Sequence, residues 1–453
     1  METDLLIIGG GPTGLAAACE ARRHGLSVRI VERLATRATM SKALVVHART
    51  MEVLETIGCA DEVLAAGQRF RALNIRPSTG ATPIRVDLVN RAWGDTRFPF
   101  WLSVPQYEVE RILEQRLVTL GGAVEFSTAL TGLRELEDSV EATLRCPDGT
   151  VATHRARWLL ACDGGRSDAR SFAGLSLERE GLGVTFALAD VMTKTDLVED
   201  EGHTVLSPEG VLLVVPMPQP GLWRLIAQVP SDFDATSLAG WSALVTKRLG
   251  VDLNLQSLGW TSRFDLTGGV ANRFRAGRVF LVGDAAHVHS PVGGQGLNTG
   301  VQDAHNLVWK LAFVQQQPLS TAQRERLLDS YERERRPIAA QMVSTTTFAT
   351  RVITVKNPIV RGLRALLARV VLRLPRFTNR LARGVGMLDL QSDGAPRLQN
   401  PELGAGVRLH DRLDRLRPTK LRWQGAEVLV RPDRIVAKPD LLPSELAVSV
   451  EAS

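Results

Sequence analysis

The stretch GDAAHVHSPVGGQGLNTGVQDAHNLVWKL, residues 283–311, decides how the chain is organised. The apolar run at residues 279–282 leads into it and predicts a short buried strand. A loop follows in which Pro291, Gly293 and Gly294 stand close together. In such a loop the backbone can approach a ligand where a Cβ atom would clash.

An amphipathic helix is predicted directly after this loop. It follows Gly296, begins near Leu297 and Asn298, and repeats apolar residues along one face. Unpaired N–H groups and the positive end of the helix dipole favour an anionic group at such an N-terminus. The stretch therefore predicts an anion-binding loop, with an ordinary tight turn as the alternative. The apolar face consists of Val301, Ala304, Val308 and Leu311.

A second glycine-rich turn lies near the N-terminus, between an apolar strand at residues 4–8 and a helix at residues 15–24. Its GxGxxG spacing allows a tight turn, a close approach to a pyrophosphate, and packing of the helix on the strand. The next strand, residues 27–31, ends in Glu32, whose carboxylate can accept hydrogen bonds from a ribose. This βαβ unit predicts dinucleotide binding, and Glu32 argues against a 2′-phosphate. The three glycines are Gly9, Gly11 and Gly14.

Several cations follow this unit. Lys42 and Arg49 lie close enough to the phosphate turn to clamp a pyrophosphate, or they are ordinary surface charges. Arg33, next to Glu32, is also a candidate for cofactor binding.

Four aromatic side chains gather within residues 93–101 of a chain that is only 5% aromatic. Such a cluster either lines an apolar pocket or fills an interface between a sheet and a domain. The candidates for a substrate pocket are therefore Trp93, Phe98, Phe100 and Trp101.

Length and composition set the class of protein. A chain of 453 residues with 44% hydrophobic and 23% charged residues suits a globular protein of two or three domains. No apolar run reaches the roughly 18–20 residues that span a bilayer, and Met1 leads directly into a strand, so we expect no signal peptide and a cytoplasmic location. Four scattered cysteines and the absence of HExxH spacing predict no disulfide and no metal site.

The net charge of +6 is unevenly distributed. Residues 351–383 hold many basic residues and no aspartate or glutamate. This asymmetry is consistent with an acidic partner, a membrane surface or nucleic acid, but a basic helical face in a protein that binds anionic cofactors is the favoured interpretation. We expect no nucleic-acid partner, and weak association with a membrane surface stays open.

Two further patterns complete the outline. Residues 158–162 form another apolar strand, which ends at Asp163 and Gly164. A helix before Pro337 is predicted to close at that proline, and residues 338–388 are predicted to form further helices.

Three separated motifs resemble those of the FAD-dependent aromatic hydroxylases, the single-component class A flavoprotein monooxygenases. They are GGGPTG with Glu32, CDGGRSDAR at residues 162–170, and RVFLVGDAAHVHSPVGGQGLNTGVQDAHNLVWKL at residues 278–311. Three other stretches most resemble the aromatic-polyketide and phenol hydroxylases: residues 41–58, VPQYEVERIL from Val104 and SYERERRPIA from Ser330.

The resemblance implies an α/β fold of the p-hydroxybenzoate hydroxylase (GR2) type: a Rossmann-like FAD-binding domain, a substrate domain built on an antiparallel sheet, and C-terminal helices. The bounds expected are residues 1–70, 103–178 and 271–345 for the FAD-binding domain, 71–102 and 179–270 for the substrate domain, 346–390 for the helices, and 391–453 for a short remnant of a thioredoxin-like domain.

For the cofactor, the resemblance implies that Gly9, Gly11 and Gly14 hold the pyrophosphate and Glu32 the adenosine ribose. Arg49 would meet the pyrophosphate and Gln106 the ribityl chain. Asp163 with Gly164 would form a second fingerprint that FAD shares with the visiting nicotinamide nucleotide. Asp284 would bind the ribityl hydroxyls, and the loop from Pro291 to Gly296 would line the flavin ring.

A single GxGxxG motif suggests that NADH or NADPH visits a surface groove rather than a second Rossmann domain. The resemblance then implies that reduced FAD reacts with O2 to give a C4a-hydroperoxide, which hydroxylates a phenolic or polyketide-like aromatic substrate. Pro291, Gly293 and Gly294 would matter most for catalysis, because no side chain stands out as a base. The alternatives are a flavin-dependent reductase or dehydrogenase and a flavin-holding binder without activity. Whichever function holds, we expect a monomer or homodimer.

Overall fold

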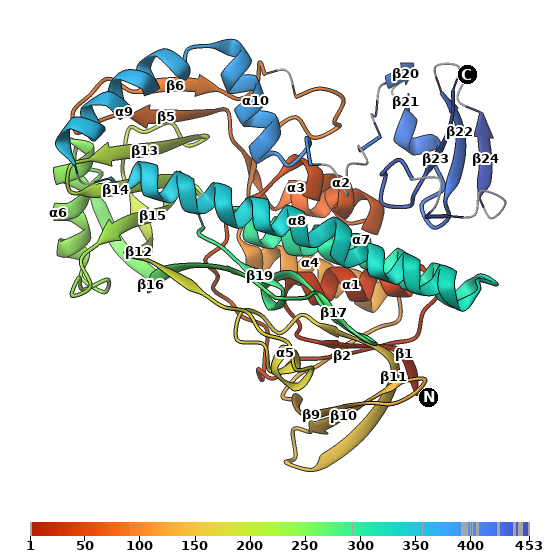
Figure 1. Cartoon of the computed structure of the whole chain (residues 1–453). Helices are drawn as coiled ribbons and strands as arrows, with labels where there is room; N and C mark the ends of the chain where they lie inside the picture. Colours follow the sequence, from red (N-terminus) through yellow and green to blue (C-terminus); the bar gives the residue numbers. More distant parts are fainter. Residues whose placement is uncertain are drawn as a thin grey trace.

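The computed structural model describes residues 2–91, 93–291, 293–355 and 357–390. In the C-terminal tail it describes residues 397–398, 400, 402–404, 407–423, 426–437, 441–442 and 447–451. Two eight-stranded sheets dominate the fold, and two long helices, α7 (Gly296–Gln316) and α8 (Thr321–Ile353), run across the middle of the molecule (Figure 1).

The first sheet has a parallel, buried centre. Its strands are β1 (Thr3–Ile8), β2 (Val28–Val31), β8 (Val124–Glu125), β9 (Ala129–Glu135), β10 (Val140–Arg145), β11 (Val151–Ala161), β17 (Arg275–Ala276) and β18 (Val279–Leu281). Their order is β17-β18-β11-β1-β2-β8, with β10 and β9 joined to β11. The pairs β1/β2, β1/β11 and β11/β18 are parallel, so the carboxyl ends of these four strands lie at one edge. Open α/β sheets bind ligands at this edge.

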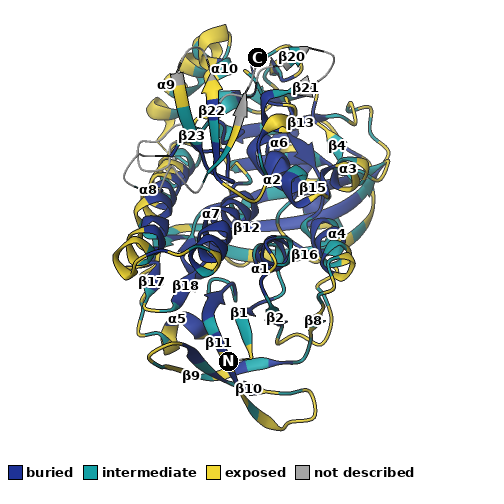
Figure 2. Ribbon diagram, turned by 90° about the vertical axis from the view of Figure 1, so that its right-hand side faces the viewer, coloured by how far each residue is buried: buried dark blue, intermediate teal, exposed yellow. Residues whose placement is uncertain are grey.

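Helices cover this sheet. They are α1 (Pro12–Arg23), α2 (Ala48–Ile57), α3 (Ala60–Ala65), α4 (Gln106–Thr119) and α5 (Asp168–Phe172). Helix α7 begins one residue before the predicted start and is buried along nearly its whole length, as Figure 2 shows. It packs on α1, and His305 Nδ1 lies 2.5 Å from Glu20 Oε1 between the two helices.

The second sheet is antiparallel except for one pair. Its strands are β5 (Ala72–Arg76), β6 (Ile84–Asp87), β12 (Glu180–Thr193), β13 (Glu201–Ser207), β14 (Gly210–Pro216), β15 (Leu222–Val229), β16 (Leu255–Val270) and β19 (His287–Val288). Their order is β19-β16-β12-β15-β14-β13-β5-β6, and only β13 and β5 run parallel. Helix α6 (Leu238–Leu249) packs on it through Trp241, which shares a core with Trp223. Strand β19 leads into the glycine loop, so this sheet reaches the loop directly.

The prediction that a helix closes at Pro337 is wrong, because α8 continues through this proline to Ile353. Proline lacks the N–H that would bond the carbonyl group of Arg333. Both Pro337 and Arg333 are exposed, so water can satisfy that carbonyl group. The opposite face buries Ile338, Ala339 and Met342, and this packing outweighs the local preference.

The predicted C-terminal helices are present as the end of α8, α9 (Pro358–Val371) and α10 (Pro375–Val385). The tail carries β20 (Glu402–Gly404), β21 (Val407–Arg408), β22 (Thr419–Trp423), β23 (Ala426–Val430) and β24 (Val448–Glu451). The last three form a small sheet in the order β23-β22-β24. The domain bounds and the thioredoxin-like character of the tail stay predictions. Among the helices that the structure describes, none is long and apolar enough to cross a membrane.

Candidate active site

The three motifs meet at the carboxyl edge of the first sheet. Gly9 has φ +108°, and a Cβ atom there would lie 2.4 Å from the carbonyl oxygen of Cys162. A Cβ atom on Gly14 would lie 2.0 Å from the carbonyl oxygen of Gly9. These two glycines are therefore required by the packing of β1, β11 and α1. A Cβ atom on Gly11 would meet nothing within 4 Å, so Gly11 faces open space, as a phosphate-binding position should.

The acid at the end of β2 is held in place by the backbone. Glu32 Oε2 accepts a 2.8 Å hydrogen bond from the N–H of Gly10, and Oε1 accepts one of 2.9 Å from the N–H of Leu34. The neighbouring Arg33 is exposed, with Nη1 3.9 Å from Asp168 Oδ2. The carboxylate thus lies beside the glycine turn, where the resemblance places an adenosine ribose.

The second motif is joined to the third by a residue that sequence reasoning missed. Asp163 accepts hydrogen bonds from Ser167 Oγ at 2.5 Å and from the N–H of Ala169 at 3.1 Å. Gly164 has φ +78° and open space beside it. Arg170 Nη1 donates a 2.9 Å hydrogen bond to the carbonyl oxygen of Ala285, which ties this turn to residues 283–285. In the sequence, the only sign of this role of Arg170 was its position within the motif CDGGRSDAR.

Asp284 lies in the short 3-10 turn η1 (Gly283–Ala285), directly after β18, and its side chain is exposed. A buried network supports this turn. Asp303 Oδ2 is 2.7 Å from His287 Nε2, and Asp303 Oδ1 accepts a 2.5 Å hydrogen bond from Arg335 Nε. Burial opposes the charge of Asp303, but Arg335 and His287 outweigh it and hold its pKa below the usual value. The sequence predicted a role for Asp284 in binding the cofactor, but it did not predict the buried network that supports the turn.

Two side chains hold the glycine loop. His47 Nε2 lies 2.7 Å from the carbonyl oxygen of Gly293. Asn298 Nδ2 donates to the carbonyl oxygens of Gly294 at 2.7 Å and Val45 at 2.8 Å, and its Oδ1 accepts from the N–H of His47 at 2.8 Å. The carbonyl groups of Gly293 and Gly294 are therefore bonded by side chains, and the N–H of Gly294 donates to the carbonyl oxygen of Pro291 at 2.9 Å within the loop. Asn298 was predicted as a cofactor residue, whereas His47 was missed.

Both helix N-termini at this edge lack a side-chain cap. Helix α1 begins after Gly11, and α7 begins after Gln295, and neither residue's side chain bonds the first turn. Their orphan N–H groups and dipoles suit anionic groups. Gly296 and Leu297 stand in the first turn of α7. An uncapped helix at each glycine motif, together with the open space at Gly11, fits a dinucleotide such as FAD.

Two more predicted residues lie where the two sheets approach each other. Lys42 Nζ is 4.3 Å from the centre of the Phe264 ring, and its exposed side chain is free to meet an anion. Gln106 begins α4, donates a 2.7 Å hydrogen bond to Glu110 Oε1, and bonds the carbonyl oxygen of Ala43 through its backbone. Their contacts with the cofactor stay predictions.

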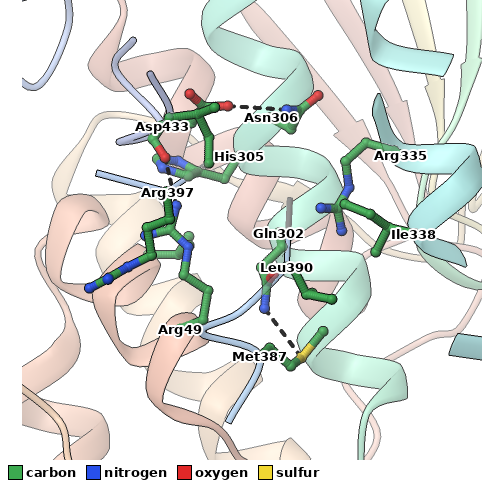
Figure 3. Close-up of a pocket in the computed structure, with 12 residues that line it drawn as sticks. Arg49, Gln302, His305, Asn306, Arg335, Ile338, Met387, Leu390, Arg397 and Asp433 are labelled. Atoms are coloured by element: carbon green, nitrogen blue, oxygen red, sulfur yellow. Dashed lines mark hydrogen bonds between the residues drawn. The ribbon is translucent and has the colours of Figure 1, made fainter. Parts of the chain in front are cut away.

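Arg49 has other partners than a pyrophosphate. Its Nη1 donates to Glu52 Oε2 at 2.8 Å and its Nη2 to the carbonyl oxygen of Asp433 at 2.6 Å. Figure 3 shows Arg49 and Arg397 from one side and residues of α7 and α8 from the other around a small cavity beneath the tail. The geometry therefore links Arg49 to the tail, and it lends no support to the expected pyrophosphate contact.

The aromatic cluster divides into two parts. Phe98 and Phe100 pack in the main core of the first sheet and its helices. Trp93 and Trp101 stack edge to face with ring centres 6.5 Å apart, and Trp101 also contacts the His47 ring at 5.9 Å. Trp101 Nε1 and His47 Nδ1 are buried without a hydrogen-bond partner. Trp101 is thus the member of the cluster that contacts a residue holding the loop, which makes it the candidate for substrate contact.

A family profile described as an FAD binding domain matches residues 2–346. Over 361 residues, the chain is 38% identical to 6-methylpretetramide 4-monooxygenase of Streptomyces rimosus. The chain belongs to the FAD-dependent aromatic hydroxylases. The match covers 78% of this chain, and the chain spans 63% of the length of that relative.

Solved structures of similar proteins agree with this assignment. OxyS, the anhydrotetracycline hydroxylase of Streptomyces rimosus, has a TM-score of 0.78 at 30% identity, covering 97% of this chain and 95% of OxyS. PyrE3, named a Diels–Alderase of pyrroindomycin biosynthesis, has the same TM-score and identity over 96% of each chain. The expected α/β fold, FAD as cofactor and the monooxygenase class of the family are confirmed.

Proposed function

We propose that this aromatic hydroxylase is an NAD(P)H-driven monooxygenase that places a hydroxyl group on an aromatic small molecule of phenolic or polyketide type. The observation that carries the proposal is the bonding of the Gly293 and Gly294 carbonyl groups by His47 and Asn298. When bound, FAD would carry electrons from NAD(P)H to O2 and supply the oxygen-inserting chemistry. The chain itself binds, orients and desolvates the reactants.

The N-terminus of α7 would stabilise negative charge on the cofactor. The uncapped first turn of α7 leaves N–H groups for the position proposed for the flavin ring, and the α7 dipole adds a positive potential. Asp284, supported by the Asp303 network, would bind the ribityl hydroxyls. These groups are fixed before any ligand arrives, so no reorganisation is needed when charge develops.

A donor and an acceptor lie together beside this loop. The neighbouring rings of Trp101 and His47 leave an indole N–H and an imidazole nitrogen buried and unpaired, and buried polar groups are normally hydrogen-bonded. A phenolic hydroxyl group can accept from the first and donate to the second. Trp101→Phe keeps an apolar ring and removes the N–H, so we expect a higher KM for a phenol and an unchanged KM for its methyl ether.

The relatives indicate which substrates to test first. The monooxygenase and the hydroxylase named above act on 6-methylpretetramide and anhydrotetracycline, which makes fused-ring aromatic polyketides the first class and simple phenols the second. The test is a screen of both classes for ligand-stimulated NAD(P)H oxidation, with the product mass measured. Stimulated oxidation with a hydroxylated product supports the proposal. Stimulated oxidation without O2 consumption would indicate a reductase, and FAD-loaded protein that fails to oxidise NAD(P)H with any aromatic ligand of either class would indicate a binder.

Location and assembly belong to the same proposal. We propose a cytoplasmic enzyme that is a monomer or a homodimer, with NADH or NADPH as reductant. Light scattering on the purified FAD-loaded chain measures the mass of the assembly, and parallel assays with the two nicotinamide nucleotides identify the reductant.

A further inference from the structure

Helix α9 turns its apolar side chains toward solvent. Exposed fractions run from 46% at Val360 to 81% at Ile359, and the helix has no buried residue. The exposed apolar residues recur at spacings of three and four, which places them in one stripe along the helix. Leu374 and Phe377 extend the stripe into α10. Its members on α9 are Ile359, Val360, Leu363, Leu366, Leu367 and Val370.

The opposite face of α9 is fastened to the protein by arginines. Arg361 Nη1 donates to the carbonyl oxygen of Pro208 at 3.2 Å. Arg364 donates to the carbonyl oxygens of Ile353 at 2.8 Å and Leu206 at 3.4 Å. An amphipathic helix of a globular protein normally packs its apolar face inward. Here the polar face is bonded to the body of the protein, and the apolar stripe is left uncovered.

Positive charge surrounds this stripe. The sequence from Arg351 to Arg383 holds nine lysines and arginines and no aspartate or glutamate. Arg369 flanks the stripe on α9, Arg373 lies in the turn that follows this helix, and Arg376 and Arg380 lie on α10. These four side chains are exposed and form no ion pair with any residue that the structure describes. Figure 2 shows α9 and α10 exposed together at one end of the molecule.

We propose that α9 and the start of α10 dock on an anionic lipid bilayer. The aliphatic stripe would enter the boundary between headgroups and acyl chains, and the flanking arginines would pair with lipid phosphates. A bilayer offers an apolar layer and negative charge in one surface, which are the two properties that this face complements.

A second copy of the chain fits this face less well. A two-fold interface joins the same patch on both subunits, so the unpaired arginines of one copy would meet those of the other. An acidic protein would satisfy the arginines, but the stripe is the outer ridge of a helix and would need an apolar groove in that protein. Both are outcomes that the experiment distinguishes.

The test is flotation of the full-length, FAD-loaded protein with vesicles of phosphatidylcholine, with and without phosphatidylglycerol. We expect binding that increases with phosphatidylglycerol and decreases in high salt. The double variant Leu363→Asp/Leu367→Asp should lower the bound fraction at least tenfold, and Arg369→Gln/Arg373→Gln should remove the preference for anionic lipid. The matched control, Val118→Asp/Val151→Asp, changes valines of 61% and 64% exposure on α4 and β11 and should bind like the unaltered chain.

The proposal fails if the protein does not float with phosphatidylglycerol vesicles at low salt, or if the α9 double variants bind as the control does. A dimer that Leu363→Asp/Leu367→Asp splits, with no vesicle binding by either form, would instead identify the stripe as an interface between copies. Retention on an immobilised acidic polypeptide without vesicle binding would overturn the lipid assignment in favour of a protein partner. FAD content and circular dichroism, measured on every variant, show that each one is folded.

Discussion

His47 bonds the carbonyl oxygen of Gly293 through Nε2 at a distance of 2.7 Å, and this contact joins the start of α2 to the glycine loop. A carbonyl oxygen only accepts, so the imidazole carries its proton on Nε2 and presents a bare Nδ1. Burial lowers the pKa of His47 to about 4, so the ring is neutral near pH 7. Together with Asn298, it fixes the face of the loop that is proposed to contact the flavin.

Removing the imidazole should loosen the loop. We expect His47→Ala to raise several-fold the share of NAD(P)H oxidised without product, because the Gly293 carbonyl group loses its donor. The loss of stability should be about 1–3 kcal/mol. Peroxide released per NAD(P)H consumed measures the uncoupling. His154→Ala removes another buried histidine, which bonds Thr3 far from the loop, and should leave coupling unchanged. Equal coupling in both variants would show that the His47 contact does not matter.

The same residue predicts a pH dependence. With a pKa near 6.5 in the unfolded chain and about 4 in the folded one, His47 contributes stability that is complete above pH 6.5 and is lost as the pH falls toward 4. His47→Gln can still donate to Gly293 but cannot titrate. The decrease in unfolding free energy between pH 7.5 and pH 5 should therefore be smaller in this variant by up to about 2 kcal/mol. Urea unfolding at the two pH values checks this, and an identical decrease in both proteins would contradict it.

Glycine at the loop is required by geometry. Gly294 has φ +64°, and a Cβ atom there would lie 3.1 Å from the Cβ atom of Val45. Gly294→Ala should therefore shift the loop and uncouple NAD(P)H oxidation from hydroxylation. Gly149→Ala is the matched control, because Gly149 has φ +82° but open space around it in a surface turn. Both variants place an alanine at a positive φ and carry backbone strain, but only Gly294→Ala should release more peroxide per NAD(P)H consumed.

Two glycines of the GxGxxG turn should respond differently to substitution by alanine. Gly11→Ala places a methyl group in open space at φ −74°, so the apoprotein should unfold at the same temperature as the unaltered chain. The methyl group would occupy the position proposed for the pyrophosphate, and we expect FAD affinity to fall at least tenfold. Gly14→Ala clashes with the Gly9 backbone and should destabilise the apoprotein itself. Undiminished FAD affinity in Gly11→Ala would place the pyrophosphate elsewhere.

The tail is held by a buried carboxylate. Glu52 Oε1 lies 2.5 Å from Arg397 Nη2, and Glu52 Oε2 lies 2.8 Å from Arg49 Nη1. Glu52→Gln leaves two buried guanidinium groups without their shared counter-charge and should cost about 3–5 kcal/mol of stability. Limited proteolysis should then cut the tail first. Glu62→Gln, an exposed change on α3, is the control. Equal stability of the two variants would show that the network does not hold the tail.

Much of this architecture could be predicted because its signals are local. The apolar runs before Gly9, Asp163 and Asp284 encode buried parallel strands, and the glycine spacing encodes the turns between strand and helix. Asn298 was also identified, as part of the motif that surrounds it.

The remaining features depend on contacts between residues far apart in the sequence. Gly293, which His47 bonds, lies 246 residues away from it, and Asp433, whose carbonyl oxygen Arg49 bonds, lies 384 residues away, so no local pattern identifies these contacts. The local rule that a proline ends a helix fails at Pro337 because the tertiary packing of α8 outweighs it. The outward orientation of the apolar stripe on α9 likewise depends on the distant carbonyl oxygens to which Arg361 and Arg364 donate.

Labelling with heavy oxygen tests the central claim most directly. A turnover of the FAD-loaded protein with NAD(P)H, an aromatic ligand that stimulates oxidation, and 18O2 should give a product carrying one 18O atom. The same turnover under 16O2 in H218O should give an unlabelled product. Stimulated NAD(P)H oxidation in which no 18O from O2 enters the product would contradict the assignment as a monooxygenase.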